Sequence, residues 1–112
     1  MKLKVKIAMF GLVFYFYAGE KELKNFRKDS KSDDEDNEAI GCCKNNYIWV
    51  RTCSDLTSII HELHHTVRFT CEKLGVDDEE TEAYMQGYLL QEICRKLNVY
   101  KISYVINKKG EK

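Results

Sequence analysis

The start of the chain alternates between basic and apolar residues. Three lysines take every second position, with aliphatic residues between them (Lys2, Leu3, Lys4, Val5, Lys6 and Ile7). A period of two is typical of a half-buried β-strand. Residues 12–17 are β-branched and aromatic, which also favours a strand. The pattern therefore predicts a core strand in this segment, ended by a turn at Ala18-Gly19.

A second interpretation of the same segment is a signal peptide. The basic start is followed by an apolar run over residues 7–18, as in such peptides. This run of about twelve residues is too short to span a bilayer as a helix, and a signal peptide does not need the alternation. We therefore expect a strand in a cytoplasmic protein. Export is the alternative, if residues 1–19 act as a signal peptide.

A short helix, a loop and a second strand follow. Leu23 and Phe26 stand three residues apart, which predicts a helix over residues 20–28 that lies on the sheet. Residues 29–40 are mostly polar or acidic and are predicted to form an acidic surface loop. They lack the glycine and the closing glutamate of an EF-hand calcium loop. Residues 47–50, Tyr-Ile-Trp-Val, predict a second short strand.

Two long helices are predicted after this strand. Apolar residues recur at steps of three and four (Leu56, Ile59, Ile60, Leu63, Val67 and Leu74). Ser54 or Asp55 can cap the N-terminus of this helix, and Gly75 is a natural stop. Asp77 and Asp78 can cap the next helix, which extends to about residue 97.

The second of these helices has a candidate packing face, and a final segment follows it. The face consists of Ala83, Gly87, Leu90, Cys94 and Leu97, and its two small residues would allow close packing between helices. Residues 99–106 alternate well enough to predict a last strand or an extended edge segment. Residues 107–112 form a charged tail.

Length and composition limit the classes of protein. The chain has 112 residues, of which 44% are hydrophobic and 32% are charged. This length suits one domain with a small core. We predict a single α+β domain over residues 1–112, with a short sheet packed against two helices. The 18 basic and 18 acidic residues cancel, and no basic stripe is visible, so we expect neither nucleic acid nor a membrane as partner.

Five cysteines bear on the redox environment: Cys42, Cys43, Cys53, Cys71 and Cys94. Their number is odd, and none forms a Cys-x-x-Cys pair that would indicate a structural zinc site. Two lie in predicted amphipathic helices, where a free cysteine behaves as a small apolar residue. We therefore expect free thiols and a reducing cytoplasm.

One motif carries candidate chemistry, the stretch His61-Glu62-Leu63-His64-His65. Positions four apart lie one turn above each other on a helix, so His61 and His65 can offer two imidazole nitrogens to one zinc ion. In a His-Glu-x-x-His arrangement, Glu62 faces the water on the metal without binding the ion, and it can act as a general base. Zinc, a water and one carboxylate suffice for amide hydrolysis.

The other ligands are less determined by the sequence. His64 also follows His61 at a helical spacing, but a His61 and His64 pair would not reproduce the motif, so we expect His64 at the surface or behind the ligands. A catalytic zinc has three protein ligands, and with no histidine left the third is a carboxylate or a cysteine. We choose Glu82, with Glu79 and Glu80 as alternatives.

The choice of Glu82 makes a geometric prediction. His65 lies nine residues before the end of its helix, about 13 Å along the axis, whereas Glu82 lies only about 6 Å into the next helix. A parallel-sided hairpin would therefore misalign them. If Glu82 is a ligand, the helices cross steeply or the first helix ends early.

The motif and its surroundings resemble the zincin metallopeptidases of the glutamate-ligand branch. The order of short strand, His-Glu-x-x-His helix, Gly75 and Glu82-Ala83-Tyr84 is most similar to small uncharacterised phage and prophage proteins of minimal zincin type, over roughly residues 46–97. The resemblance implies His61 and His65 as zinc ligands, Glu62 as base and Glu82 as third ligand.

The resemblance also has implications for the substrate. It implies that residues 47–51 form an edge strand beside the cleft, where an extended peptide could add a strand. No histidine or tyrosine that would stabilise an oxyanion is obvious after Glu82. Tyr84 and Tyr88 are candidates, although tyrosines at this spacing are more often core residues.

Three functions follow from these patterns. The first is a zinc-dependent metallopeptidase that acts on a peptide or protein substrate. The second is a catalytically inactive, zinc-stabilised binding or accessory module of phage type. The third is a metal-free interaction protein with a helical hairpin packed on a small sheet.

Overall fold

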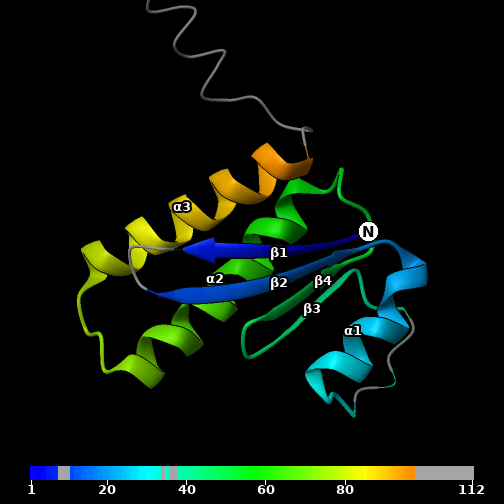
Figure 1. Cartoon of the computed structure of the whole chain (residues 1–112), viewed down its shortest axis with the longest axis horizontal. Helices are drawn as coiled ribbons and strands as arrows, with labels where there is room; N and C mark the ends of the chain where they lie inside the picture. Colours follow the sequence, from blue (N-terminus) through cyan, green and yellow to red (C-terminus); the bar gives the residue numbers. More distant parts are fainter. Residues whose placement is uncertain (8–10, 34, 36–37, 98–112) are drawn as a thin grey trace, which may run out of the picture.

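A computed structural model describes residues 1–7, 11–33, 35 and 38–97. These residues form an α+β fold in which a four-stranded mixed sheet is covered by helices on both faces (Figure 1). The strands are β1 (Lys2–Ile7), β2 (Leu12–Ala18), β3 (Gly41–Lys44) and β4 (Tyr47–Val50), in the order β1-β2-β4-β3. The α-helices are α1 (Leu23–Ser30), preceded by a 3₁₀ turn over Glu20–Glu22, α2 (Leu56–Leu74) and α3 (Glu79–Leu97). The predicted fold class is confirmed.

The N-terminal segment forms two strands, where the sequence predicted one. β1 and β2 are antiparallel, with Lys2 opposite Tyr17 and Ile7 opposite Leu12. Gly11, just before β2, has a φ of 64°, a left-handed conformation that glycine adopts without strain. The alternating run and the aromatic run are therefore successive strands, and the strand interpretation of the segment is confirmed.

The strand over residues 47–50 is confirmed, but its predicted place at the sheet edge is wrong. β4 is parallel to β2 on one side and antiparallel to β3 on the other, so it lies inside the sheet. The edge strand beside β4 is β3, which the sequence pattern did not predict because Gly41, Cys42, Cys43 and Lys44 show no clear alternation.

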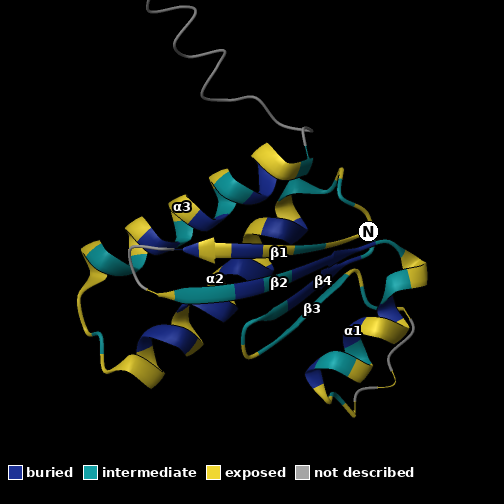
Figure 2. Ribbon diagram, in the orientation of Figure 1, coloured by how far each residue is buried: buried dark blue, intermediate teal, exposed yellow. Residues whose placement is uncertain are grey.

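The larger part of the core lies between the sheet and helices α2 and α3. α2 packs on β3 and β4, and α3 packs on β1 and on α2. Figure 2 shows the buried positions of β2 and β4 in the middle of the sheet. The residues that fill this layer are fully buried aliphatic and aromatic side chains, among them Phe14, Phe16, Ile48, Ile59, Leu63, Val67, Met85, Leu89 and Ile93.

The opposite face of the sheet is covered by α1. Tyr17 and Trp49 alternate with the residues of the main core and pack against Leu23 and Phe26, which confirms the short helix on the sheet. Two residues assigned to the acidic loop, Asp29 and Ser30, belong to this helix. The Ser30 hydroxyl donates to the Phe26 carbonyl, so its polar group is satisfied within the helix.

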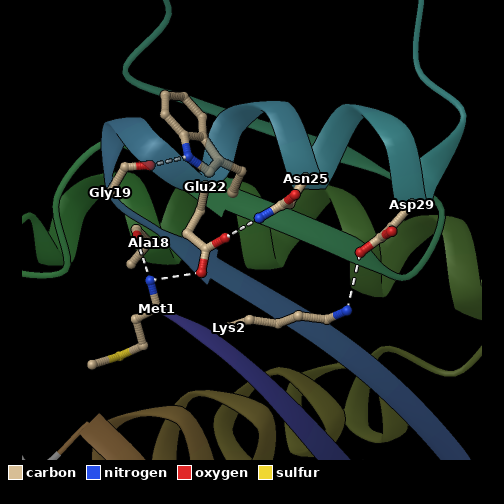
Figure 3. A network of polar contacts seen from close by, with 8 residues as sticks. Met1, Lys2, Ala18, Gly19, Glu22, Asn25 and Asp29 are labelled. Carbon is tan, nitrogen blue, oxygen red and sulfur yellow. Dashed lines mark hydrogen bonds and ion pairs between the residues drawn. The ribbon is translucent and has the colours of Figure 1, made fainter.

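Polar contacts fasten α1 and its 3₁₀ turn to the sheet (Figure 3). Asp29 accepts hydrogen bonds from the Tyr17 hydroxyl at 2.6 Å and from Lys2 Nζ at 3.0 Å. These bonds hold the pKa of the Asp29 carboxyl below its usual value. The Met1 amino group lies 2.9 Å from a Glu22 carboxylate oxygen and donates to the Ala18 carbonyl. The strands of the N-terminal segment are thus integral to the fold.

The bounds of α2 agree with the sequence pattern. The Asp55 carboxylate accepts a hydrogen bond from the Ser58 backbone N–H at 3.1 Å, which identifies Asp55 as the N-cap. Gly75 ends the helix in a left-handed conformation, with φ 72°. Both predicted ends of the motif-bearing helix are confirmed.

The predicted packing face of α3 is confirmed in part: Cys94 is buried and Leu90 and Leu97 pack against the core, but the two small residues are misplaced. Ala83 and Gly87 are exposed, and the fully buried residues are Met85, Leu89 and Ile93. The face that packs on the core is thus broader than predicted and is centred on Met85, Leu89 and Ile93. The small residues therefore do not contribute to helix packing.

Two remaining predictions concern the C-terminus and the cysteines. The strand predicted over 99–106 and the tail 107–112 lie outside the described residues. All five cysteines are free, and Cys71 and Cys94 are buried, as predicted. Within the described ranges, no helix has both the length and the apolar character needed to cross a bilayer.

Candidate metal centre

His61 and His65 lie side by side on the exposed surface of α2. Their Nε2 atoms are 3.1 Å apart, and their ring centroids are 4.7 Å apart with the ring planes at 82°. The pair is adjacent because a helix places residues i and i+4 one turn apart on the same face. The structure therefore brings both predicted histidine ligands together, with their Nε2 atoms in contact.

The separation of these two nitrogens fits a shared zinc ion. Zn–N bonds of 2.0–2.1 Å at a tetrahedral angle separate two nitrogen ligands by about 3.3 Å. The observed 3.1 Å is close to that value, and in the structure this contact is a hydrogen bond between the two rings. A shared ion would have to replace that hydrogen bond and take a lone pair from each nitrogen.

Glu62 turns away from solvent and toward the edge strand β3. Its side chain is only 10% exposed, and its Oε2 lies 4.0 Å from His61 Nε2. Burial raises the pKa of the Glu62 carboxyl, and the neighbouring His61 and His65 act in the opposite direction. A carboxylate in this environment is a stronger base than an exposed one, which suits proton transfer.

Gly41 makes room for the Glu62 carboxylate. A Cβ atom at position 41 would lie 3.0 Å from both Cγ and Oε2 of Glu62. In the sequence, Gly41 only follows the predicted loop over residues 29–40 and has no other distinguishing feature. Its role in the site depends on the pairing of β3 with β4 and on the packing of α2 over β3, neither of which leaves a local signal.

His64 lies outside the pair, as expected. Its ring is exposed, and its centroid is 6.0 Å from that of His65, compared with 4.7 Å between His61 and His65.

Glu82 is bound by an arginine. Arg68 Nη1 lies 3.0 Å and 3.3 Å from the two carboxylate oxygens of Glu82. α2 does not end early, since it continues to Leu74. Glu82 is opposite Arg68, nearly one helical turn beyond His65. Glu82 and His65 are therefore misaligned, as expected for a helical hairpin.

The two alternative ligands, Glu79 and Glu80, lie at the start of α3. Glu79 and Glu80 are exposed in its first turn, where acidic residues complement the helix dipole. The Glu80 backbone N–H donates to the Asp78 carboxylate, the N-terminal cap predicted from the sequence. Across the part of the chain that the structure describes, no three His, Cys, Asp or Glu residues are grouped closely enough to hold a metal.

The Cys43 thiol lies close enough to Glu62 to feel the charge of its carboxylate. Burial, followed by the charge of Glu62, raises the pKa of the Cys43 thiol to about 11. A thiol that stays protonated near neutral pH is a poor metal ligand, because the thiolate is the form that binds zinc.

The two tyrosine candidates of α3 are at the surface. The exposed fraction is 70% for Tyr84 and 40% for Tyr88, so the expectation that they are core residues is wrong.

No protein-family model, curated protein or solved structure matches this chain. The similarity to zincins therefore depends on the motif and its neighbouring residues alone, and it stays a prediction.

Proposed function

We propose that this protein is a zinc-dependent metallopeptidase that hydrolyses peptide bonds with a water activated at His61, His65 and Glu62. The observation that carries the proposal is the 3.1 Å separation of the two Nε2 atoms, with the buried Glu62 carboxylate 4.0 Å from one of them. Two nitrogens that could bind a metal and a carboxylate that could act as a base therefore lie within about one turn of α2.

The residues of the motif have distinct roles in this proposal. His61 and His65 hold the metal through Nε2. Zinc in such a site lowers the pKa of a water and polarises a carbonyl group. Glu62 would take the proton of the attacking water and could pass it to the leaving amine. Burial raises the pKa of the Glu62 carboxyl, which makes the carboxylate a stronger base.

The edge strand β3 is where we expect a peptide substrate. The Arg51 N–H donates to the Ile40 carbonyl at 3.0 Å. In an antiparallel ladder the hydrogen-bonded pairs alternate, so the peptide groups of Gly41 and Cys43 point away from β4. An extended peptide could pair with these groups and pass the Glu62 carboxylate, which lies against Gly41. Strand addition is therefore expected at β3 and not at β4, because β4 is paired on both sides.

A second candidate is a catalytically inactive zinc-stabilised binding or accessory module. The observation in its favour is the engagement of Glu82 by Arg68. A site with only two histidines binds zinc less tightly than a catalytic site with three protein ligands.

Zinc content and hydrolysis together test the proposal. We expect about one zinc per chain in protein purified without a histidine tag, and its loss in both His61→Ala and His65→Ala. Hydrolysis of an unstructured protein such as casein should depend on zinc and disappear in Glu62→Gln. Zinc binding without hydrolysis would favour the accessory module. A wild-type chain that contains no metal would refute both zinc proposals and favour a metal-free interaction protein.

A further inference from the structure

A row of four side chains crosses the sheet on the face that carries α1. Lys4 on β1 is opposite Tyr15 on β2, which is opposite Tyr47 on β4. Tyr47 is in turn opposite Lys44 on β3. Residues that are paired directly across a sheet share a face. Two tyrosines on the inner strands therefore stand between one lysine on each outer strand.

Helix α1 covers the neighbouring row of this face and leaves the tyrosine row open. It lies beside the end of the sheet at which β1 begins and β2 ends (Figure 1). There Tyr17 and Trp49 pack against its side chains and are fully buried. Tyr15 and Tyr47 are only partly buried, and their rings stack with centroids 5.0 Å apart and planes at 15°. Two aromatic rings are thus accessible in the middle of the sheet.

The lysines beside these rings carry positive charge that no carboxylate of the described residues neutralises. Lys4 and Lys6 are exposed on β1 and form no ion pair there. Lys44 Nζ donates to a backbone carbonyl, so its charge is not compensated. Lys2, in contrast, is paired with Asp29 (Figure 3). The open part of this face is therefore basic, although the chain as a whole has no net charge.

We propose that this lysine–tyrosine face, formed by Lys4, Lys6, Tyr15, Lys44 and Tyr47, binds a single-stranded nucleic acid. Sites of this kind combine aromatic side chains, on which bases stack, with basic residues that contact the backbone. Here the tyrosines contact bases and the lysines contact phosphates. The proposal does not depend on the zinc site, which is on α2, and α2 packs on the other face of the sheet.

The combination of aromatic and basic residues favours this partner over other anionic ones. The bases of a duplex are stacked inside it, so a flat sheet face would reach little more than its phosphates. An anionic membrane would be attracted by the lysines, but it gives no role to two rings that lie between strands and stack on each other. The expectation of no nucleic-acid partner came from the balance of charge over the whole chain, which does not show what strand pairing brings together.

The tyrosines are tested with a fluorescently labelled oligothymidylate of about 10 nucleotides, a length typical of such sites. Its binding to the full chain is measured by fluorescence anisotropy at low salt. Tyr47→Leu should weaken binding about 10-fold, because the contact with one stacked base is lost. Tyr47→Phe keeps the aromatic ring and should bind as wild type does. A duplex of the same length should bind about 10-fold more weakly than the single strand.

The lysines are tested by the salt dependence of the same binding. In the double variant Lys4→Gln with Lys6→Gln, the slope of log affinity against log salt should fall by about 0.7 for each lysine removed. Lys96→Gln is the matched control, since Lys96 is exposed on α3, a helix that packs on the other face of the sheet. This variant should leave both the affinity and the slope unchanged.

Several results would overturn the proposal. The absence of binding at low salt would refute it directly. Equal affinity for duplex and single strand, or wild-type affinity in Tyr47→Leu, would show that charge alone explains the binding. Binding to vesicles that contain phosphatidylserine but not to the oligonucleotide would identify a membrane as the partner. Circular dichroism of each variant shows whether a loss of binding is a loss of fold, and the zinc content of the wild-type chain is measured separately.

Discussion

The candidate site has a local part and a long-range part, and the two differ in how they are built. His61, Glu62 and His65 come from one turn of α2, and their mutual geometry follows from the helix itself. Glu82 comes from another helix, and its position depends on how α2 and α3 pack. The local part has the geometry expected for zinc, whereas the long-range part is engaged by Arg68. A motif within one helix can therefore have its expected geometry although the residue expected from a second helix does not join it.

The largest expected effect is on the local part. His61→Ala or His65→Ala should weaken zinc binding about 1000-fold, because the free energy of a zinc site, about 10–16 kcal/mol, is shared among its ligands. Zinc titration with a competing chelator measures this loss. His64→Ala is the control on the same helix and should bind zinc normally. An equal loss of zinc affinity in all three variants would contradict the assignment of His61 and His65 as the two histidine ligands.

Glu62 separates metal binding from chemistry within the same turn. Glu62→Gln should lower the rate of peptide hydrolysis about 100-fold or more, since it removes a general base but keeps the shape of the side chain. Zinc should be retained, because in this motif the glutamate does not bind the ion. Hydrolysis of casein and zinc titration of the same preparation measure the two quantities. Undiminished hydrolysis in this variant would exclude Glu62 as the base.

The sequence predicts the local part well because its determinants are local. The N-cap Asp55, the C-cap Gly75 and the spacing of the two histidines are properties of a single helix, and each is confirmed in the structure. The strand Tyr47–Val50 was equally clear, since four β-branched or aromatic residues favour one conformation.

The long-range part could not be predicted in the same way. Nothing in the sequence indicates that Gly41 begins an edge strand against Glu62, or that Arg68 faces Glu82. Even the packing face of α3 was predicted only in part, since Met85 rather than Gly87 faces the core. These features depend on strand order and helix packing, which emerge from many contacts at once.

Gly41 tests the contact between the two parts. Gly41→Ala places a methyl group 3.0 Å from Glu62 Cγ and Oε2, so the carboxylate must move by a few tenths of an ångström. We expect about a 10-fold loss of hydrolysis with zinc affinity unchanged, because general-base catalysis is sensitive to small displacements.

Gly87 is the matched control for this substitution. A Cβ atom at position 87 meets nothing within 4 Å, so Gly87→Ala should leave hydrolysis unchanged. It should also raise the stability of the fold by about 1 kcal/mol, because alanine is the better helix former. If both variants lose activity equally, the close approach of Gly41 to Glu62 is not the cause.

The smallest effect concerns the stability of the metal-free chain. Burial raises the pKa of Glu62 in the folded state above its usual value of 4.5. A raised carboxyl pKa means that the folded state holds its proton more strongly than the unfolded chain. The contribution of Glu62 to stability is therefore fully present below pH 4.5 and is lost as the pH rises through the folded-state pKa.

Glu62→Gln removes this dependence. At neutral pH and without metal, the variant should be more stable than wild type by about 1 kcal/mol, an ordinary size for one substitution. The difference should shrink toward zero near pH 4, where the wild-type carboxyl is protonated. Urea unfolding at both pH values in the presence of a chelator measures it. A variant less stable than wild type at neutral pH would contradict this. It would show that the buried Glu62 carboxylate stabilises the fold.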